Sequence, residues 1–250
     1  MYKQILFSIA LLLVSIHLAA QTFEINKSSG KIHVEGLNDL KIEGYDGNKI
    51  VITSKSYSHS DNERAKGLSA INAKGIKDNT GIGLVVQEED NEIRIMSVKK
   101  YSDDYEMKVP KGMAIAFENG SNRMDKLHIE KIQGEVEVEL QFGSVELENV
   151  SGPLSISTVH GHIEATFNQL SSKGPSTLYS VHGLVDVTLP AGAKLDIHLS
   201  SNFGDMFTDF DVKVPAESSL SSKRVTGTIN GGGTELRINS NHNNIYLRKG

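Results

Sequence analysis

The chain has 250 residues, a formal net charge of −5 and no cysteine. Without cysteine it has no disulfide, thiolate nucleophile or cysteine metal site, and without a basic cluster it lacks the usual footprint of a nucleic-acid partner. Glycine is abundant, with 23 residues, whereas proline is scarce and tryptophan is absent. This composition is typical of many short strands joined by tight turns.

Residues 1–20 have the pattern of a secretory signal peptide. Lys3 provides a positive start, residues 5–18 are almost entirely apolar, and Ala19-Ala20 precede Gln21. The apolar run is shorter than the roughly 20 residues that a spanning helix needs, which disfavours the alternative of a retained anchor. We expect cleavage before Gln21, no membrane span thereafter, and a single domain over residues 21–250 in the periplasm or at the cell surface.

Short strands follow, marked by apolar residues that alternate with polar ones. Residues 58–81 interrupt this alternation because they are polar and have no period of two. We expect a long excursion from the strand array there. The apolar pairs on either side of it are Ile32/Val34, Leu40/Ile42, Ile50/Ile52, Ile93/Ile95, Met107/Val109, Ile115/Phe117 and Leu127/Ile129.

A nine-residue repeat occupies the middle of the chain. Gly134, Gly143, Gly152 and Gly161 are evenly spaced, and each precedes two apolar residues at alternate positions. Alternation of this kind indicates a half-buried strand, and we expect each glycine to supply the unusual backbone angles of a tight corner. Gly183 and Gly204 extend the series of corner glycines.

A longer repeat combines two of these units. "GPLSISTVHG" (152–161) and "GPSTLYSVHG" (174–183) share both ends and have the same order of residue types between them. Two nine-residue units make one turn of a stacked repeat, and a polar insertion between these two segments lengthens one turn. Further on, residues 215–227 predict a second polar excursion before the last strand pairs, Leu236/Ile238 and Ile245/Leu247.

The repeat indicates an all-β parallel solenoid with strands at about nine-residue spacing and about 18–22 residues per turn. The alternative is an antiparallel β-sandwich, which also has short strands at regular spacing. The solenoid is favoured because successive units are alike in one chain direction. The last strand runs into Arg248 and Lys249, and we expect these charges to protect the open end.

The residue before a corner glycine should stack on its counterpart in the next turn. Phe142, His160, His182 and Phe203 would then form one column of rings, which we call the corner column, with a spacing of about 4.8 Å. We expect it to exclude water from the corner. A metal ion on His160 and His182 is the alternative, which lacks a third ligand. The sequence leaves it open, and His162 should point to solvent.

Other site chemistries find little support. The nine-residue period matches calcium-binding toxin repeats, but the turns lack their aspartates. Glu146 should lie near Glu164 on an outward face, which indicates a solvated acidic surface or a weak site for a cation or basic partner. No G-x-S-x-G elbow and no convergent acid–base group is present. We therefore expect no catalytic residues, no cofactor and no metal site.

The segments "GHIEATF", "HGLVDVTLPAGAKLDIHLSSNFGD" and "GGGTELRINSNHNNIYLRKG" resemble the "putative adhesin" family, domain of unknown function 4097. The "AAQ" cleavage site and "DNTGIGLVV" (78–86) are similar to its members in Bacteroidetes. The resemblance covers most of residues 21–250. It implies a right-handed β-helix-like fold, a cell-envelope location and no catalytic residues.

We therefore predict a non-catalytic, exported envelope protein that binds an envelope glycan or protein through its long faces. Two alternatives remain. One is a structural or envelope-stress-related periplasmic protein without a ligand, and the other is a β-helix enzyme that acts on polysaccharide.

Overall fold

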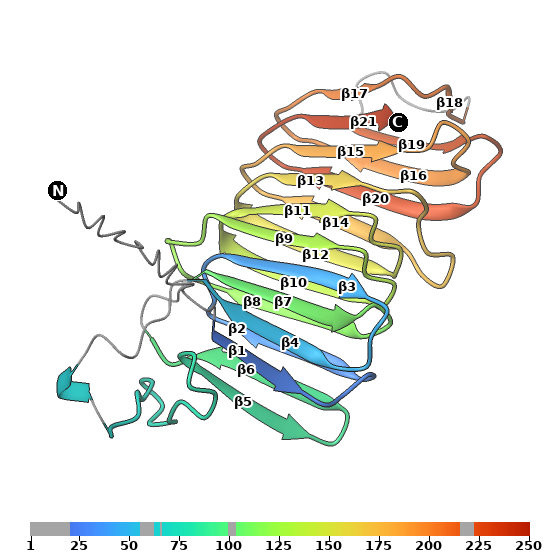
Figure 1. Cartoon of the computed structure of the whole chain (residues 1–250). Helices are drawn as coiled ribbons and strands as arrows, with labels where there is room; N and C mark the ends of the chain where they lie inside the picture. Colours follow the sequence, from blue (N-terminus) through green and yellow to red (C-terminus); the bar gives the residue numbers. More distant parts are fainter. Residues whose placement is uncertain (1–20, 56–62, 66, 100–103, 216–222) are drawn as a thin grey trace, which may run out of the picture.

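The computed structural model describes residues 21–55, 63–65, 67–99, 104–215 and 223–250. Within these ranges the fold is all-β apart from one short 3₁₀ helix, η1 (Glu63–Ala65). The strands form two large sheets that face each other along an elongated stack (Figure 1). The described part of the chain has no helix that is long and apolar enough to cross a membrane.

The two sheets differ by one strand. Sheet A has ten strands in the order β1 (Gln21–Ile25), β4 (Ile50–Ser54), β7 (Tyr105–Pro110), β3 (Leu40–Tyr45), β9 (Lys126–Glu130), β11 (Ser144–Glu148), β13 (Ile163–Thr166), β15 (Val185–Leu189), β21 (Ile245–Lys249) and β17 (Met206–Thr208). Sheet B has eleven, in the order β18 (Val212–Lys213), β19 (Arg224–Ile229), β16 (Leu195–Ser200), β20 (Thr234–Ser240), β14 (Ser176–Ser180), β12 (Leu154–His160), β10 (Val136–Phe142), β8 (Ala114–Asn119), β2 (Lys31–Glu35), β6 (Glu92–Ser97) and β5 (Leu84–Glu89).

The central turns confirm the parallel solenoid. Each turn consists of one strand of sheet B followed by one strand of sheet A, as in β10–β11 and β12–β13. Val136 pairs with Leu154 one short turn further on, and Leu154 pairs with Ser176 after the longer turn that carries the insertion. Both pairings are parallel. The antiparallel sandwich is therefore wrong. Within the described ranges, antiparallel strand pairs occur only toward the ends of the stack. At one end they are β1–β4, β4–β7 and β5–β6, and at the other they are β16–β19 and β18–β19.

Turns near both ends stack out of chain order. The last turn, β20–β21, lies between β14–β15 and β16–β17, and the first turn, β2–β3, lies between β6–β7 and β8–β9. The expectation that Arg248 and Lys249 protect an open end is wrong, because β21 lies inside sheet A between β15 and β17. The edge strands are β1 and β17 in sheet A and β5 and β18 in sheet B.

The core lies between the sheets and is built by alternation. In β10, Val136, Val138 and Leu140 are buried while Glu137 and Glu139 are half-buried or exposed. The same alternation in almost every turn produces one continuous apolar cluster from Ile25 to Leu247. Since each buried aliphatic side chain contributes about 1.5–3 kcal/mol, stacking of turns is the main source of stability for a chain without disulfides.

The predicted excursions are only partly described. Residues 1–20, the proposed signal peptide, lie outside the described residues, as do 56–62, 66 and 216–222. In the first excursion, Ala70 and Ile76 pack on Val85, Met96 and Val98 at the outside of sheet B. The second excursion is shorter than 215–227, because β19 starts at Arg224 and pairs with β16.

Candidate functional site

The corner column is a stack of five rings rather than four. The Phe142 and His160 rings lie 5.0 Å apart, and those of His160 and His182 lie 4.7 Å apart. The next ring is His242, at 4.8 Å from His182, and Phe203 follows at 4.7 Å from His242. The structure thus brings all four predicted residues into one column and inserts His242, because the β20–β21 turn stacks out of chain order.

The corner column is an exposed ridge. His160, His182 and His242 are exposed, Phe142 is half-buried, and Phe203 retains 72 % of its accessible surface. Beneath the exposed rings, Thr158, Ser180 and Ser240 are fully buried, so the corner on the core side of the stack is closed to water. His162 lies outside the column in solvent, and its Nδ1 accepts a hydrogen bond from the Leu184 N–H at 3.0 Å.

A column of buried hydroxyls runs beneath the rings. Ser180 Oγ donates to the Gly161 carbonyl at 2.8 Å, and Ser240 Oγ donates to the Gly183 carbonyl at 2.9 Å. Thr158 makes the equivalent bond to Gly143 at 3.2 Å. Each hydroxyl lies two positions before a ring, so the sequence signal is the hydroxyl-x-ring motif in "TVHG", "SVHG", "SNHN" and "SNFG". This motif was not predicted from the sequence. Its hydroxyls donate to corner carbonyl groups that would otherwise be buried without a hydrogen bond.

The corner glycines are required by close approach of neighbouring turns. A Cβ at Gly161 would lie 1.8 Å from the Gly143 carbonyl oxygen, and one at Gly183 would lie 1.7 Å from that of Gly161. Of the six predicted corner glycines only Gly143 has a positive φ, of 93°. The backbone-angle explanation is therefore wrong for the other five. The same contact occurs at Gly134, Gly152 and Gly204, with distances of 2.0, 1.7 and 2.1 Å to backbone oxygens.

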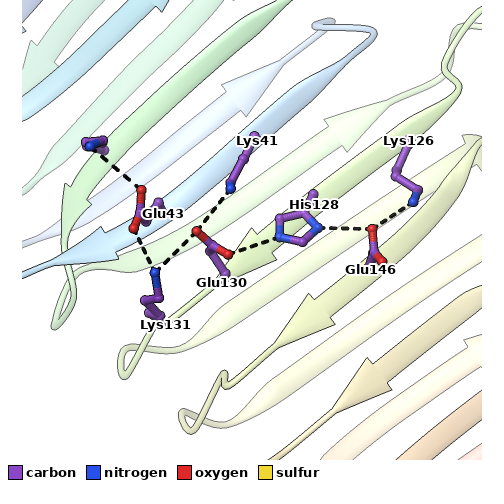
Figure 2. Close-up of polar contacts among 8 residues, drawn as sticks. Lys41, Glu43, Lys126, His128, Glu130, Lys131 and Glu146 are labelled. Atoms are coloured by element: carbon purple, nitrogen blue, oxygen red, sulfur yellow. Dashed lines mark hydrogen bonds and ion pairs between the residues drawn. The ribbon is translucent and has the colours of Figure 1, made fainter.

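A chain of ion pairs crosses the outer face of sheet A (Figure 2). Lys126 Nζ lies 2.7 Å from Glu146 Oε2, which also lies 3.0 Å from His128 Nδ1. The other ring nitrogen of His128 lies 3.4 Å from Glu130 Oε2. Glu130 Oε1 lies 3.1 Å from Lys41 Nζ. The chain then continues through Lys131 to Glu43 and Lys108, so it links strands β7, β3, β9 and β11.

These contacts lower the pKa of three carboxyl groups. Hydrogen bonds from Lys126 and His128 hold the pKa of Glu146 below its usual value. Burial acts to raise the pKa of Glu130, but hydrogen bonds from Lys41 and His128 outweigh it. The pKa of Glu43 is lowered in the same way, first by its bond to Lys131. Each carboxylate therefore stabilises the fold in its charged form.

Among the described residues, one cluster that overlaps this chain of ion pairs has metal-ligand chemistry. Possible ligand atoms of His128, Glu146 and Glu148 all lie within 4.8 Å of one another. The Lys126 ammonium, however, already contacts the Glu146 oxygen that faces His128. We assign the cluster to the ion-pair chain for that reason.

Glu146 also stands in a column of acids. It pairs in register with Glu164, as predicted, and Glu164 pairs with Asp186 on the next strand. Arg248 binds Asp186 through Nε and Nη2 at 2.8 and 2.9 Å. Within the described ranges the exposed Glu164 carboxylate has no ion-pair partner, so the column carries its unpaired charge in the middle.

We expect Glu146→Gln to weaken the pH dependence of stability. Because the folded pKa of Glu146 is below its ordinary value of 4.5, its stabilisation is complete above that pH and is lost as the pH falls through the folded pKa. The variant should lose up to about 1 kcal/mol near neutral pH, and this loss should shrink as the pH falls below 4.5. Urea unfolding at neutral pH and at a series of lower pH values measures this. Glu164→Gln is the control and should cost nothing at neutral pH; equal losses in both variants would contradict the assignment.

A groove of about 570 Å³ crosses the outer face of sheet B at its C-terminal half. Two rows of side chains line it across β14, β20, β16 and β19. Strand register places Thr177, Arg237, His198 and Thr226 in one row, and Tyr179, Asn239, Ser200 and Arg224 in the next. The groove thus combines two guanidinium groups, an imidazole, a phenol ring, an amide and three hydroxyls.

Glu235 fixes the position of two of these groups from the side. Its Oε1 lies 2.7 Å from Arg237 Nη2, 2.8 Å from Arg237 Nε and 3.3 Å from His198 Nε2. The other ring nitrogen of His198 lies 3.4 Å from the Thr226 hydroxyl. Arg237 and His198 therefore share one carboxylate partner, and no carboxylate of the described residues lines the groove itself.

The two-sheet solenoid and its repeated corners match a known family. The family model described as Toastrack DUF4097 matches residues 8–248. The chain belongs to the Toastrack DUF4097 family. This Toastrack domain is β-solenoid-like, as predicted. A comparison with curated proteins returned no match.

Two solved structures are similar to this Toastrack chain. A "putative cell adhesion protein" from Clostridium sporogenes has 11 % identity and a TM-score of 0.48, with 92 % of this chain and 100 % of that chain covered. A "putative lipid binding protein" from Parabacteroides distasonis has 13 % identity and a TM-score of 0.31, with 92 % and 96 % covered. Both similarities are distant.

No local signal in the Toastrack sequence marks the groove. Tyr179 and Asn239 are paired neighbours, but several strands separate them along the chain. Arg224 falls within the predicted polar excursion, although it starts strand β19. The groove forms only because β20 inserts between β14 and β16.

Proposed function

We propose that this protein is an exported, non-catalytic binding protein whose sheet B groove recognises an acidic glycan of the cell envelope. The observation that carries the proposal is the set of side chains that line the groove. Glu235 contacts Arg237 through Nε and Nη2, which leaves the edge of its guanidinium that carries Nη1 for a carboxylate. Arg224 adds a second positive charge to the groove. Asn239 and the hydroxyls of Thr177, Ser200 and Thr226 offer hydrogen-bond partners suited to sugar hydroxyls.

Tyr179 adds a partly apolar platform to this polar set. Sugar rings present C–H faces as well as hydroxyls, and an aromatic ring beside polar groups accommodates both. Its neighbours across the sheet, Ser157 and Asn239, are small enough to leave the ring accessible from the groove side. A concave site with a few convergent polar groups is the usual form of a small-ligand site.

The lining favours binding over hydrolysis. Glycoside hydrolysis ordinarily needs two carboxyl groups on opposite sides of the scissile bond. No Asp or Glu of the described chain lines the groove, and the nearby Glu235 is engaged by Arg237 and His198. This supports the non-catalytic proposal over a polysaccharide-acting enzyme.

We expect Arg237→Ala to weaken binding to immobilised polygalacturonate by about 10- to 100-fold, since a charge-assisted hydrogen bond contributes about 1.5–3 kcal/mol. Tyr179→Ala should weaken it as well, and neutral dextran should bind weakly to every variant. Arg94→Ala is a matched control: Arg94 lies on the same face of sheet B and contacts Glu92, two positions before it, at 2.9 Å, as Arg237 contacts Glu235. Biolayer interferometry measures the affinities.

Equal affinity for polygalacturonate and dextran, or equal loss in Arg94→Ala and Arg237→Ala, would contradict the acidic-glycan site. Export is tested separately by cell fractionation. The fractionated protein should begin at Gln21 on N-terminal sequencing, and a cytoplasmic chain that retains residues 1–20 would contradict it.

A further inference from the structure

The outermost turn at the C-terminal end of the solenoid exposes large apolar side chains. Phe203 is 72 % exposed, Phe207 is 48 % exposed and Val214 is 50 % exposed. Phe207 belongs to β17, which lies beyond β21 at the end of the stack (Figure 1). The remaining exposed large hydrophobic residues of the described chain, Leu68 and Ile71, belong to the excursion near the opposite end.

The backbone of β17 has a free side. Among the described residues it pairs only with β21, in parallel register from Met206 to Thr208. Asp205 directs its carbonyl toward β21, where it accepts the Ile245 N–H at 2.9 Å. Because alternate residues of a strand point their N–H and C=O groups to opposite sides, Met206 and Thr208 direct theirs away from β21. This edge can therefore accept another strand.

Two columns of rings end at the same edge. The Phe203 ring stacks on His242 at 4.7 Å and 2°, and the Phe207 ring stacks on Tyr246 at 5.2 Å and 12°. Within the described chain, each phenyl ring has a stacking partner on one face only. A strand added at about 4.8 Å from β17 would place side chains four positions apart over the two uncovered faces.

The negative charge around β17 indicates what kind of partner strand could add to this edge. Residues 203–211, "FGDMFTDFD", contain three aspartates and no lysine or arginine, and Asp205, Asp209 and Asp211 are all exposed. The nearest cations of β21 are engaged, because Arg248 binds Asp186 and the Lys249 ammonium lies over the Phe210 ring at 5.5 Å. A second copy would bring these aspartates together edge to edge, which disfavours self-association and favours a cationic partner.

We propose that the β17 edge docks an extended, cationic segment of a partner protein, which adds to sheet A as a further strand. The segment carries Lys or Arg residues opposite the aspartates and planar side chains four positions apart that cover Phe203 and Phe207. β17 is short and is flanked by aspartates, which disfavours pairing with like edges. These features make the site selective for such a segment. This site is independent of the sheet B groove.

The experiment pans a phage library of random dodecapeptides on the protein. Enriched peptides should contain Lys or Arg and two aromatic residues four positions apart. They should bind Thr208→Pro at least about tenfold more weakly, because proline removes the outward N–H of β17. Thr208→Val is the matched control, because both variants lose the hydroxyl that accepts the Phe210 N–H at 3.0 Å. Thr208→Val keeps the backbone N–H and should therefore bind normally. Phe207→Ser should weaken binding as Thr208→Pro does.

Several outcomes would overturn the proposal. They are enrichment of acidic peptides, equal binding to Thr208→Pro and to the unaltered protein, and the absence of any enriched peptide. Sedimentation that shows Phe207-dependent dimers would assign the edge to a second copy instead. Arg237→Ala should leave peptide binding unchanged, so failure of the glycan site and failure of this site remain distinguishable.

Discussion

Gly183→Ala is expected to destabilise the protein by at least about 3 kcal/mol, which corresponds to a fall of roughly 6–12 °C in the unfolding midpoint for a chain of this size. The added Cβ would lie 1.7 Å from the Gly161 carbonyl oxygen and 2.4 Å from its carbon. These are backbone atoms, so no side-chain rotation relieves the contact. The two turns must move apart.

Separation of these turns would break more than one interaction. Ser180 Oγ donates to the Gly161 carbonyl and accepts the Gly183 N–H, both at 2.8 Å. The stacked rings of His160 and His182 would also separate from their 4.7 Å spacing. Gly183→Ala should therefore disturb the corner column, which NMR shifts of the histidine rings would show.

Gly192→Ala is the matched control for this substitution. Gly192 lies in the loop between β15 and β16, where an added Cβ meets no atom within 4 Å and φ is not positive. We expect its unfolding midpoint to equal that of the unaltered protein or to rise slightly. If thermal unfolding gave Gly183→Ala and Gly192→Ala the same midpoint, close approach of the turns would not explain the corner glycines.

Ending the chain at Gly233 is expected to unfold the C-terminal third of the solenoid. This removes β20 and β21, whose side chains Leu236, Ile238, Ile245 and Leu247 are almost fully buried. Their loss alone corresponds to about 6–12 kcal/mol of burial. The larger effect is topological, because β16 would lose β20 as a partner and β17 would lose its only partner among the described strands.

Hydrogen exchange with mass spectrometry distinguishes this outcome from the loss of one terminal repeat. Peptides from β16 and β19 should lose protection, whereas those from β8 to β13 should keep it. Starting the chain at residue 26 is the control, because it removes only β1, an edge strand whose one described partner is β4. Retained protection of β16 and β19 after truncation would mean that β14 and β16 pair directly and that the inserted turn is dispensable.

Much of the fold could be predicted because its signals are local. The alternation in Val136 and Val138 determines which side chains face the core, and the spacing of Gly152 and Gly161 reflects a contact that recurs in successive central turns. Even so, the reason for the glycines was misjudged. A sequence shows that glycine recurs, and it does not show whether a backbone angle or a neighbouring turn requires it.

The ring column shows where local signals end. The repeated "VHG" places His160 and His182 one turn apart, and their stacking follows from it. His242 belongs to "SNHN", which lacks the corner glycine, and it enters the column from a turn near the far end of the chain. Exposure of the column could not be predicted either, because it depends on what covers the corner.

By itself, the sequence determined that short strands alternate between core and solvent, that two of them make one repeating turn and that the turns stack in parallel, since each of these properties depends on neighbours along the chain. The tertiary structure alone decided which turn stacks on which. Every turn presents a similar backbone edge to the next, so register and order depend on the complete set of contacts at both ends. That choice places β20 beside β14, and it creates both the sheet B groove and the uncovered β17 edge.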